Sequence, residues 1–216
     1  MVKWLATDLP ILSGHAGLAL HLAAEGRDVV ADYAVNAFNP LTADEYFSRG
    51  VRRIVSSVEL TVAELAALTA PWGGAGFDVV VFGRPEGMTI EHCVLSAAFD
   101  RVATTCRDLC VKSHPVVELT DPAGYTFPVA TDSACRNRLL HSRPIEASEF
   151  LPALWKAGLR GYHLLFNVPG DPVTPVVAAT ARALGALARG DVPDETAAIR
   201  TLLGQAFTRG HFQRAV

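Results

Sequence analysis

The sequence is poor in charge, in cysteine and in long apolar runs, and each shortage excludes a class of protein. Only 19% of the 216 residues are charged and the formal net charge is −3, so no basic field is present to hold nucleic acid by its phosphates. No apolar run approaches the roughly 18 residues that a membrane span requires. The first residues, MVKWLATDLPILSG, lack the basic stretch and unbroken apolar run of a signal peptide. We therefore expect a cytoplasmic protein with no membrane contact.

Half of the residues are apolar, which is enough for a sizeable core. No internal repeat or low-complexity linker marks a boundary along the chain. The sequence therefore predicts a single domain over residues 1–216.

Short β-like runs alternate with helix-like segments along most of the chain. At about 20 to 25 residues per unit, this alternation is typical of parallel β/α folds. It predicts an α/β protein with a partial or complete (β/α) barrel-like fold. The expected strands cover residues 2–6, 28–35, 51–57, 78–83 and 162–168, and the expected helix N-caps are Ser13, Ser148 and Thr61, the last in a capping box with Glu64.

The pattern changes after residue 110. Residues 115–132 contain two β-rich runs around the turn sequence DPAG, which predicts an antiparallel hairpin. We expect this hairpin to be an insertion in the barrel-like fold.

The few cysteines are unevenly placed, since three of the four lie within residues 91–110. In a reducing cytoplasm, clustered cysteines hold metal more often than they form disulfides. Cys106 and Cys110 are four positions apart and would share one face of a helix. Buried apolar thiols, a zinc site and an iron–sulfur cluster all stay open. The tight C-x2-C knuckle of structural zinc sites is absent, yet the spacing alone leaves cluster and zinc nearly even.

Several motifs resemble the collagenase-like peptidase family U32. They are FGRPEGMTIEHC, LTDPAGYTFPVATDSACR and FTRGHFQ, together with SSVEL at residues 56–60. Members of that family commonly carry GR-x-x-x-M-x-x-x-x-C, then L-x-D-x-x-G-x-x-F-P-V, then Cys-Arg. The agreement runs in order across residues 28–145.

The resemblance implies a barrel-type fold and a cofactor. Several members are implicated in oxygen-independent hydroxylation of ubiquinone precursors, of a tRNA uridine or of an rRNA cytidine, and four cysteines hold a 4Fe-4S cluster in them. The corresponding ligands here would be Cys93, Cys106, Cys110 and Cys135. The implied function is hydroxylation of a small aromatic or RNA substrate.

The chain resembles only the C-terminal part of that family. Full-length members begin with a strand and a P-A-G motif, which do not precede VKWLATDLP here. A half barrel would expose strand edges. We therefore expect self-association, or binding of a second family-like chain, through residues 2–6 and the sheet edge.

Other residues are candidates for the reaction or for substrate binding. Glu59 follows a predicted strand, at the end where barrel active sites lie, and His92 neighbours Cys93, so both are candidate catalytic residues. Asp32 and Asn36 would line the same barrel mouth. Arg84 and Arg136 could bind a substrate carboxylate through their guanidinium groups.

Two alternative functions stay open. A peptidase would need a nucleophile with a base, and the sequence has no G-x-S-x-G, H-E-x-x-H or catalytic-cysteine signature. A non-catalytic partner subunit with a four-cysteine zinc site is the other alternative.

Overall fold

The computed structural model of the protein describes residues 6–102, 106, 108–132, 134–204 and 206–214, and these residues form two sheets. The larger sheet has parallel strands in the order β1-β2-β3-β4-β10, with the short strand β9 antiparallel to β4. These strands are β1 (Ile11–Ser13), β2 (Val29–Ala31), β3 (Arg53–Val55), β4 (Phe77–Gly83), β9 (Ile145–Glu146) and β10 (Gly161–Leu164). The predicted α/β class with a parallel sheet is confirmed, and the partial or complete (β/α) barrel stays a prediction.

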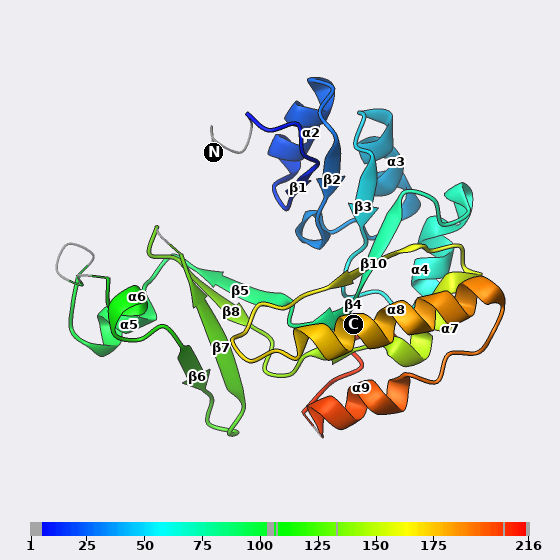
Figure 1. The fold of residues 1–216 in the computed structure, drawn as a ribbon. Coiled ribbons are helices and arrows are strands. Elements are labelled where there is room, and N and C mark those ends of the chain that lie inside the picture. The colour runs from blue at the N-terminus through cyan, green and yellow to red at the C-terminus, as the bar shows by residue number, and fades with distance from the viewer. Residues whose placement is uncertain (1–5, 103–105, 107, 133, 205, 215–216) are drawn as a thin grey trace.

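Helices connect the strands of this sheet, and two more helices, α8 (Val173–Arg189) and α9 (Thr196–Leu203), follow its last strand (Figure 1). The connecting helices are α2 (Ala16–Ala24), α3 (Pro40–Ser48), α4 (Val62–Thr69) and α7 (Leu151–Lys156), with 3-10 turns η1 (Tyr33–Val35), η2 (Ala70–Trp72) and η3 (Ser148–Phe150). Among the described residues, no helix has both the length and the apolar character to cross a membrane.

One face of the large sheet carries the main core. Residues that alternate along the strands, such as Ile54, Phe77 and Val79, pack against apolar side chains of α2, α3, α4 and α7. Leu65 and Leu154 are fully enclosed in this cluster. Burying a leucine side chain contributes about 1.5–3 kcal/mol, so this face holds strands and helices in register.

The opposite face of the sheet carries a buried charge network. The carboxylate of Asp78 on β4 pairs with the guanidinium of Arg53 on β3, and with Nε2 of His163 on β10 at 3.0 Å. Asp78 is only 3% exposed, so this carboxylate requires its partners. The network ties three neighbouring parallel strands together.

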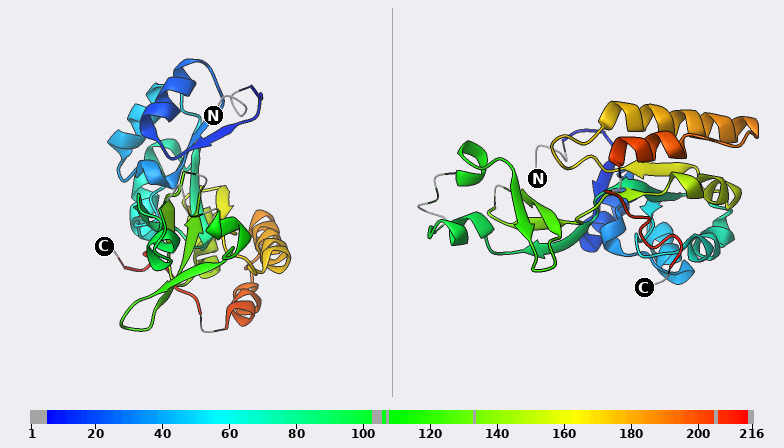
Figure 2. Two further views of the ribbon diagram at one scale, coloured as in Figure 1. Left: turned by 90° about the vertical axis from the view of Figure 1, so that its left-hand side faces the viewer. Right: turned by 90° about the horizontal axis from the view of Figure 1, so that it is seen from below.

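The second sheet is antiparallel, with strands in the order β5-β8-β7-β6. Its strands are β5 (Glu86–Ile90), β6 (Val117–Thr120), β7 (Thr126–Thr131) and β8 (Asn137–Leu140). It extends to one side of the large sheet and carries the short helices α5 (Val94–Ala98) and α6 (Leu109–Lys112) at its far end (Figures 1 and 2). The predicted hairpin at 115–132 is confirmed as β6 and β7, within a larger sheet than the sequence suggested.

Some local predictions need correction. Helix α2 is capped by His15, whose Nδ1 accepts the N–H of Leu18 at 3.1 Å, because Ser13 is the last residue of β1. Ser148 does not cap a helix, because its hydroxyl donates to the buried carboxylate of Glu146. The capping box of Thr61 is confirmed. The strand expected at residues 2–6 falls on residues 2–5, outside the described part, and on a turn at residue 6.

Candidate functional site

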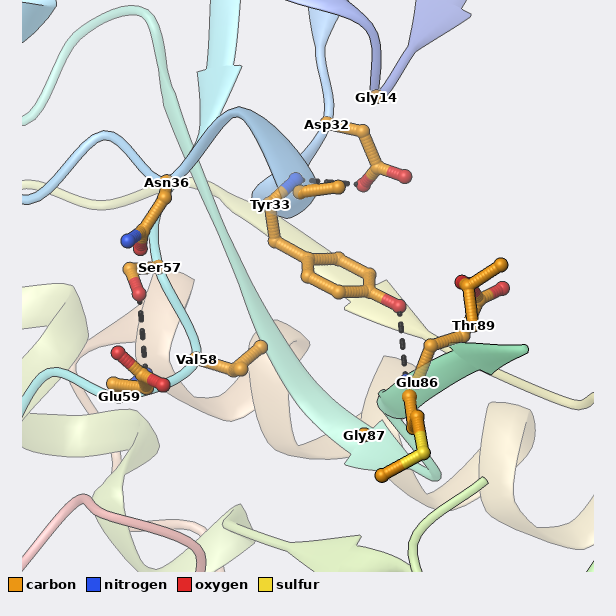
Figure 3. Close-up of a pocket in the computed structure, with 12 residues that line it drawn as sticks. Gly14, Asp32, Tyr33, Asn36, Ser57, Val58, Glu59, Glu86, Gly87 and Thr89 are labelled. Atoms are coloured by element: carbon orange, nitrogen blue, oxygen red, sulfur yellow. Dashed lines mark hydrogen bonds between the residues drawn. The ribbon is translucent and has the colours of Figure 1, made fainter. Parts of the chain in front are cut away.

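A pocket of about 490 Å³ opens where β1, β2 and β3 end and β5 begins (Figure 3). The carboxyl ends of parallel strands are where β/α proteins place their ligands, because the connecting loops gather there. Twelve residues line the pocket: Gly14, Asp32, Tyr33, Ala34, Asn36, Ser57, Val58, Glu59, Glu86, Gly87, Met88 and Thr89.

Asp32 follows β2 directly and begins η1. One carboxylate oxygen accepts the N–H of Tyr33 at 2.8 Å. Burial raises the pKa of Asp32 above that of an ordinary aspartate, and the Glu86 carboxylate adds to this, while the Tyr33 N–H and the charge of His163 act in the other direction. Asp32 is therefore a carboxyl group whose ionised form the pocket disfavours.

Tyr33 connects the two sheets across the pocket. Its hydroxyl oxygen accepts the N–H of Glu86, the first residue of β5, at 3.2 Å, and its ring spans the space between Asp32 and Glu86 (Figure 3). Burial also raises the pKa of Tyr33, so the phenol stays protonated at neutral pH. The ring offers a flat apolar surface inside a polar pocket.

Glu59 and Asn36 lie on the side of the pocket away from β5. Glu59 is exposed, and its N–H donates to Oγ of Ser57 at 3.4 Å, while Asn36 ends η1 in the left-handed conformation at φ 54°. The lining of the pocket contains three carboxylates and no lysine or arginine. The third carboxylate, Glu86, is paired with Arg138 at 2.6 Å. The pocket therefore favours an uncharged or cationic ligand over an anionic one.

The cysteines lie together at the far end of the small sheet. Cys93 precedes α5, Cys106 precedes α6, Cys110 lies in α6, and Cys135 lies in the turn between β7 and β8. Burial raises the pKa of Cys135, and the charges of Cys106, Cys93 and Cys110 raise it further. Ile90 of β5 pairs with Asn137 of β8, so Cys93 and Cys135 lie beyond the same end of the small sheet. Helix α5 contacts α6 there, which brings Cys106 and Cys110 to that end as well.

The conformation of the Cys135 turn is fixed by Asp132. Its carboxylate accepts the N–H groups of Ala134 at 2.9 Å and Arg136 at 3.0 Å, and its carbonyl oxygen accepts the N–H of Cys135. Arg136 also forms an ion pair with this carboxylate. These contacts hold Cys135 at φ 61°, which few non-glycine residues adopt.

Cys93 lies among polar groups. Its sulfur accepts the N–H of Ser96 at 3.5 Å. Burial acts to raise the pKa of Cys93, but the polar groups of Ser96, Leu95 and Asn137 near the sulfur outweigh burial and lower it. The four thiols are free, and within the described residues no three His, Cys, Asp or Glu side chains are arranged to hold a single metal ion, so the cysteines form no compact one-metal site.

Comparison with protein-family models finds one decisive match. The model of Peptidase family U32 matches residues 19–199. The chain belongs to peptidase family U32. No curated protein and no solved structure matches this U32 chain.

The structure brings some of the predicted site residues of this U32 chain together. Asp32, Asn36 and Glu59 line one pocket, and the four cysteines gather at a second place. The two places are joined by β5, which begins in the pocket and ends three residues before Cys93. Cys106 and Cys110 do not share a helix, because α6 begins at residue 109.

The other predicted residues lie outside the pocket. His92 is exposed between β5 and α5. Arg84 donates to the carbonyl oxygens of His141, at 3.0 Å, and of Ser142. The guanidinium group of Arg84 is hydrogen-bonded to these carbonyl oxygens, and that of Arg136 is paired with the Asp132 carboxylate. Binding of a substrate carboxylate by Arg84 and Arg136 stays a prediction.

Sequence reasoning missed the aromatic and β5 side of the pocket. Tyr33, Glu86, Met88 and Thr89 line it and were not predicted. Tyr33 directly follows Asp32, so its position in ADYAVN was an available signal. Glu86 and Met88 lie in GRPEGM, which was used only as part of the family motif and not to predict pocket residues.

Proposed function

We propose that this U32 chain binds a 4Fe-4S cluster through Cys93, Cys106, Cys110 and Cys135 and carries out oxygen-independent hydroxylation of a small aromatic or RNA substrate. The observation that carries the proposal is that four thiols from three separate segments of the chain gather at one end of the small sheet. All four are free and only partly buried, so they do not simply fill an apolar core.

The residues fit the cluster by their chemistry. Iron–sulfur clusters are held by four thiolates, and the low pKa of Cys93 favours that form. Cluster is preferred over zinc because the sequence resembles cluster-binding members and lacks a C-x2-C knuckle. When bound, a 4Fe-4S cluster supplies one-electron transfer.

The pocket between β2, β3 and β5 is the proposed substrate site. Its volume of about 490 Å³ suits one aromatic ring system, and the Tyr33 ring provides a surface for stacking. Thr89 lies four residues before Cys93, so their Cα atoms are at most about 14 Å apart. The proposed substrate pocket and the proposed cluster would therefore lie at the two ends of the same short strand, β5.

The charges near the cysteines favour the small aromatic substrate over RNA. Arg136 and Arg138 could have formed a basic patch with Arg143, but the first pairs with Asp132 at 3.0 Å and the second with Glu86 at 2.6 Å. An RNA backbone needs unpaired cations. In the pocket, Asp32 and Glu59 are placed to accept hydrogen bonds from ring N–H or O–H groups.

Four single Cys→Ser variants test the cluster assignment. Each should lose most of its iron and its brown colour after anaerobic purification, because a cubane needs all four protein thiolates. The matched control is Ser113→Ala, an exposed position just after α6, which should keep both. A variant that retains full iron would remove its cysteine from the ligand set.

Pocket variants test the substrate assignment. Glu59→Gln and Tyr33→Leu should each weaken binding of a hydroxylated aromatic probe at least tenfold in anaerobic calorimetry, while iron content stays unchanged. Equal binding by wild type and both variants would place the substrate elsewhere.

The hydrolase that the family name suggests is the second candidate. The observation that favours it is Cys93, whose lowered pKa is also typical of a nucleophilic thiol. A metal-free chain under reducing conditions should then cleave gelatin, and Cys93→Ala should abolish the cleavage. We expect no cleavage, because among the described residues this sulfur is hydrogen-bonded by the N–H of Ser96 and by no histidine or carboxylate that could act as its base.

A further inference from the structure

Two buried polar groups beside Cys93 have no hydrogen-bond partner. Among the described residues, five buried side-chain nitrogen or oxygen atoms lack one, and two of them are Oγ of Ser96 and Nδ2 of Asn137. Ser96 is 8% exposed and Asn137 is fully buried. Leaving such a donor buried and unpaired destabilises the folded protein, so each requires an explanation.

Both groups adjoin the same sulfur. Ser96 lies in α5 and its N–H already donates to Sγ of Cys93 at 3.5 Å. Asn137 is the first residue of β8, and its Oδ1 accepts the N–H of Val94, the residue after Cys93, at 2.7 Å. That bond holds the Asn137 side chain next to the Cys93 loop and leaves its Nδ2 without a partner there, as is the Oγ of Ser96 in the same loop turn.

We infer that Ser96 and Asn137 are positioning residues that donate hydrogen bonds to the sulfur of Cys93 when it carries negative charge as a cluster ligand. A neutral thiol is a weak acceptor, which explains why both donors lack a partner around the free cysteine. A thiolate accepts several hydrogen bonds. This inference rests on the proposed function, because the cluster keeps the sulfur negatively charged.

Hydrogen bonds to ligand sulfurs also tune the cluster. The reduced cluster carries more negative charge on its sulfurs than the oxidised cluster does. Hydrogen bonds to the sulfurs therefore stabilise the reduced cluster more strongly and raise the reduction potential. Asn137 has a second effect, because it joins the Cys93 loop to β8, which starts two residues after Cys135. The Asn137 side chain thus holds the loop of Cys93 next to the strand that follows Cys135.

The test is an anaerobic redox titration of the cluster, followed by electron paramagnetic resonance. Ser96→Ala should shift the equilibrium between the reduced and oxidised cluster three- to tenfold toward the oxidised form, while the iron content stays unchanged. A tenfold shift lowers the one-electron reduction potential by 59 mV. Asn137→Asp keeps an acceptor for Val94 but places a carboxylate beside the sulfur, so it should retain less than half of the iron.

The control is Ser56→Ala, which removes another fully buried serine hydroxyl, bonded to the carbonyl of Asp78 in the large sheet. It should lower stability without moving the potential. An unchanged potential in Ser96→Ala, together with full iron in Asn137→Asp, would overturn the inference.

The inference and the proposed function fail in different ways. Iron-free wild-type protein would overturn the proposed cluster, and the donors are then tested by the rate at which iodoacetamide alkylates Cys93 in the metal-free chain at pH 7. Ser96→Ala should slow that reaction three- to tenfold relative to wild type and to Ser56→Ala. Equal rates would overturn the donor role as well.

Discussion

Gly161→Ala is a one-carbon change that should disrupt the charge network of the large sheet. A Cβ atom at Gly161 on β10 would overlap the Asp78 carboxylate and approach the Arg53 guanidinium. Neither can move away easily, because Asp78 is 3% exposed and His163 holds its other oxygen at 3.0 Å. The substitution must therefore separate a buried carboxylate from at least one of its partners.

The size of the effect follows from the burial of Asp78. Removing one partner of a buried ion pair costs about 3–5 kcal/mol, and we expect about 3 because the Arg53 side chain is 43% exposed and partly solvated. Domains of this size lose about 2–4 °C in Tm per kcal/mol, so the expected decrease is roughly 6–12 °C. Urea unfolding followed by circular dichroism measures the same loss as free energy.

Gly185→Ala is the matched control. Gly185 lies within α8, where a Cβ meets only the end of the Arg189 side chain at 3.5 Å. Alanine should stabilise the helix by about 0.5–1 kcal/mol. The reasoning would be refuted if Gly161→Ala unfolded within 1 kcal/mol of wild type, because the network would then not restrain the strands.

Three further predictions concern the pocket, the cysteines and the sheet edge. Asp32→Asn should stabilise the protein at pH 7, because the raised pKa of Asp32 makes its ionised form costly in the folded state. This gain should disappear below about pH 3.9, the pKa of an unfolded aspartate, where Asp32 is protonated in both states. A gain in urea unfolding that stays constant from pH 3 to pH 7 would contradict this. Cys106→Ser should speed amide hydrogen exchange across residues 93–135, because the free energy of metal binding also stabilises the local fold. An exchange rate equal to that of the wild type would mean that no bound metal stabilises this segment. Leu12→Asp should reduce self-association in light scattering, or binding of a second U32 chain when one is added, since Leu12 is 53% exposed on the edge strand β1. A monomeric wild type at high concentration would remove the self-association hypothesis.

The sequence predicted the elements that local patterns specify. The strand and helix alternation from residue 16 to residue 83, the capping box of Thr61 and the hairpin around DPAG are present, because periodicity, caps and turn residues act over a few positions. The strand expected over residues 28–35 is shorter, because Tyr33–Val35 form the 3-10 turn η1. Ser148 was wrong as a helix cap because its hydroxyl bonds to buried Glu146, a contact that depends on the tertiary fold.

Long-range contacts were beyond such patterns. Strand β5 is largely exposed and has no alternation, and it pairs with β8, almost fifty residues later in the chain. The role of Tyr33 arises from its bond to Glu86 on the other sheet. Spacing alone did not predict that Cys135 would approach the other cysteines, and only the family resemblance implied it.

Iron and acid-labile sulfide analysis of the anaerobically purified wild-type chain tests the central claim most directly. A 4Fe-4S cluster on Cys93, Cys106, Cys110 and Cys135 predicts about four irons and four sulfides per chain, with a broad absorption that dithionite bleaches. One zinc per chain and no sulfide, or no metal at all, would contradict the cluster and, with it, the proposed hydroxylation.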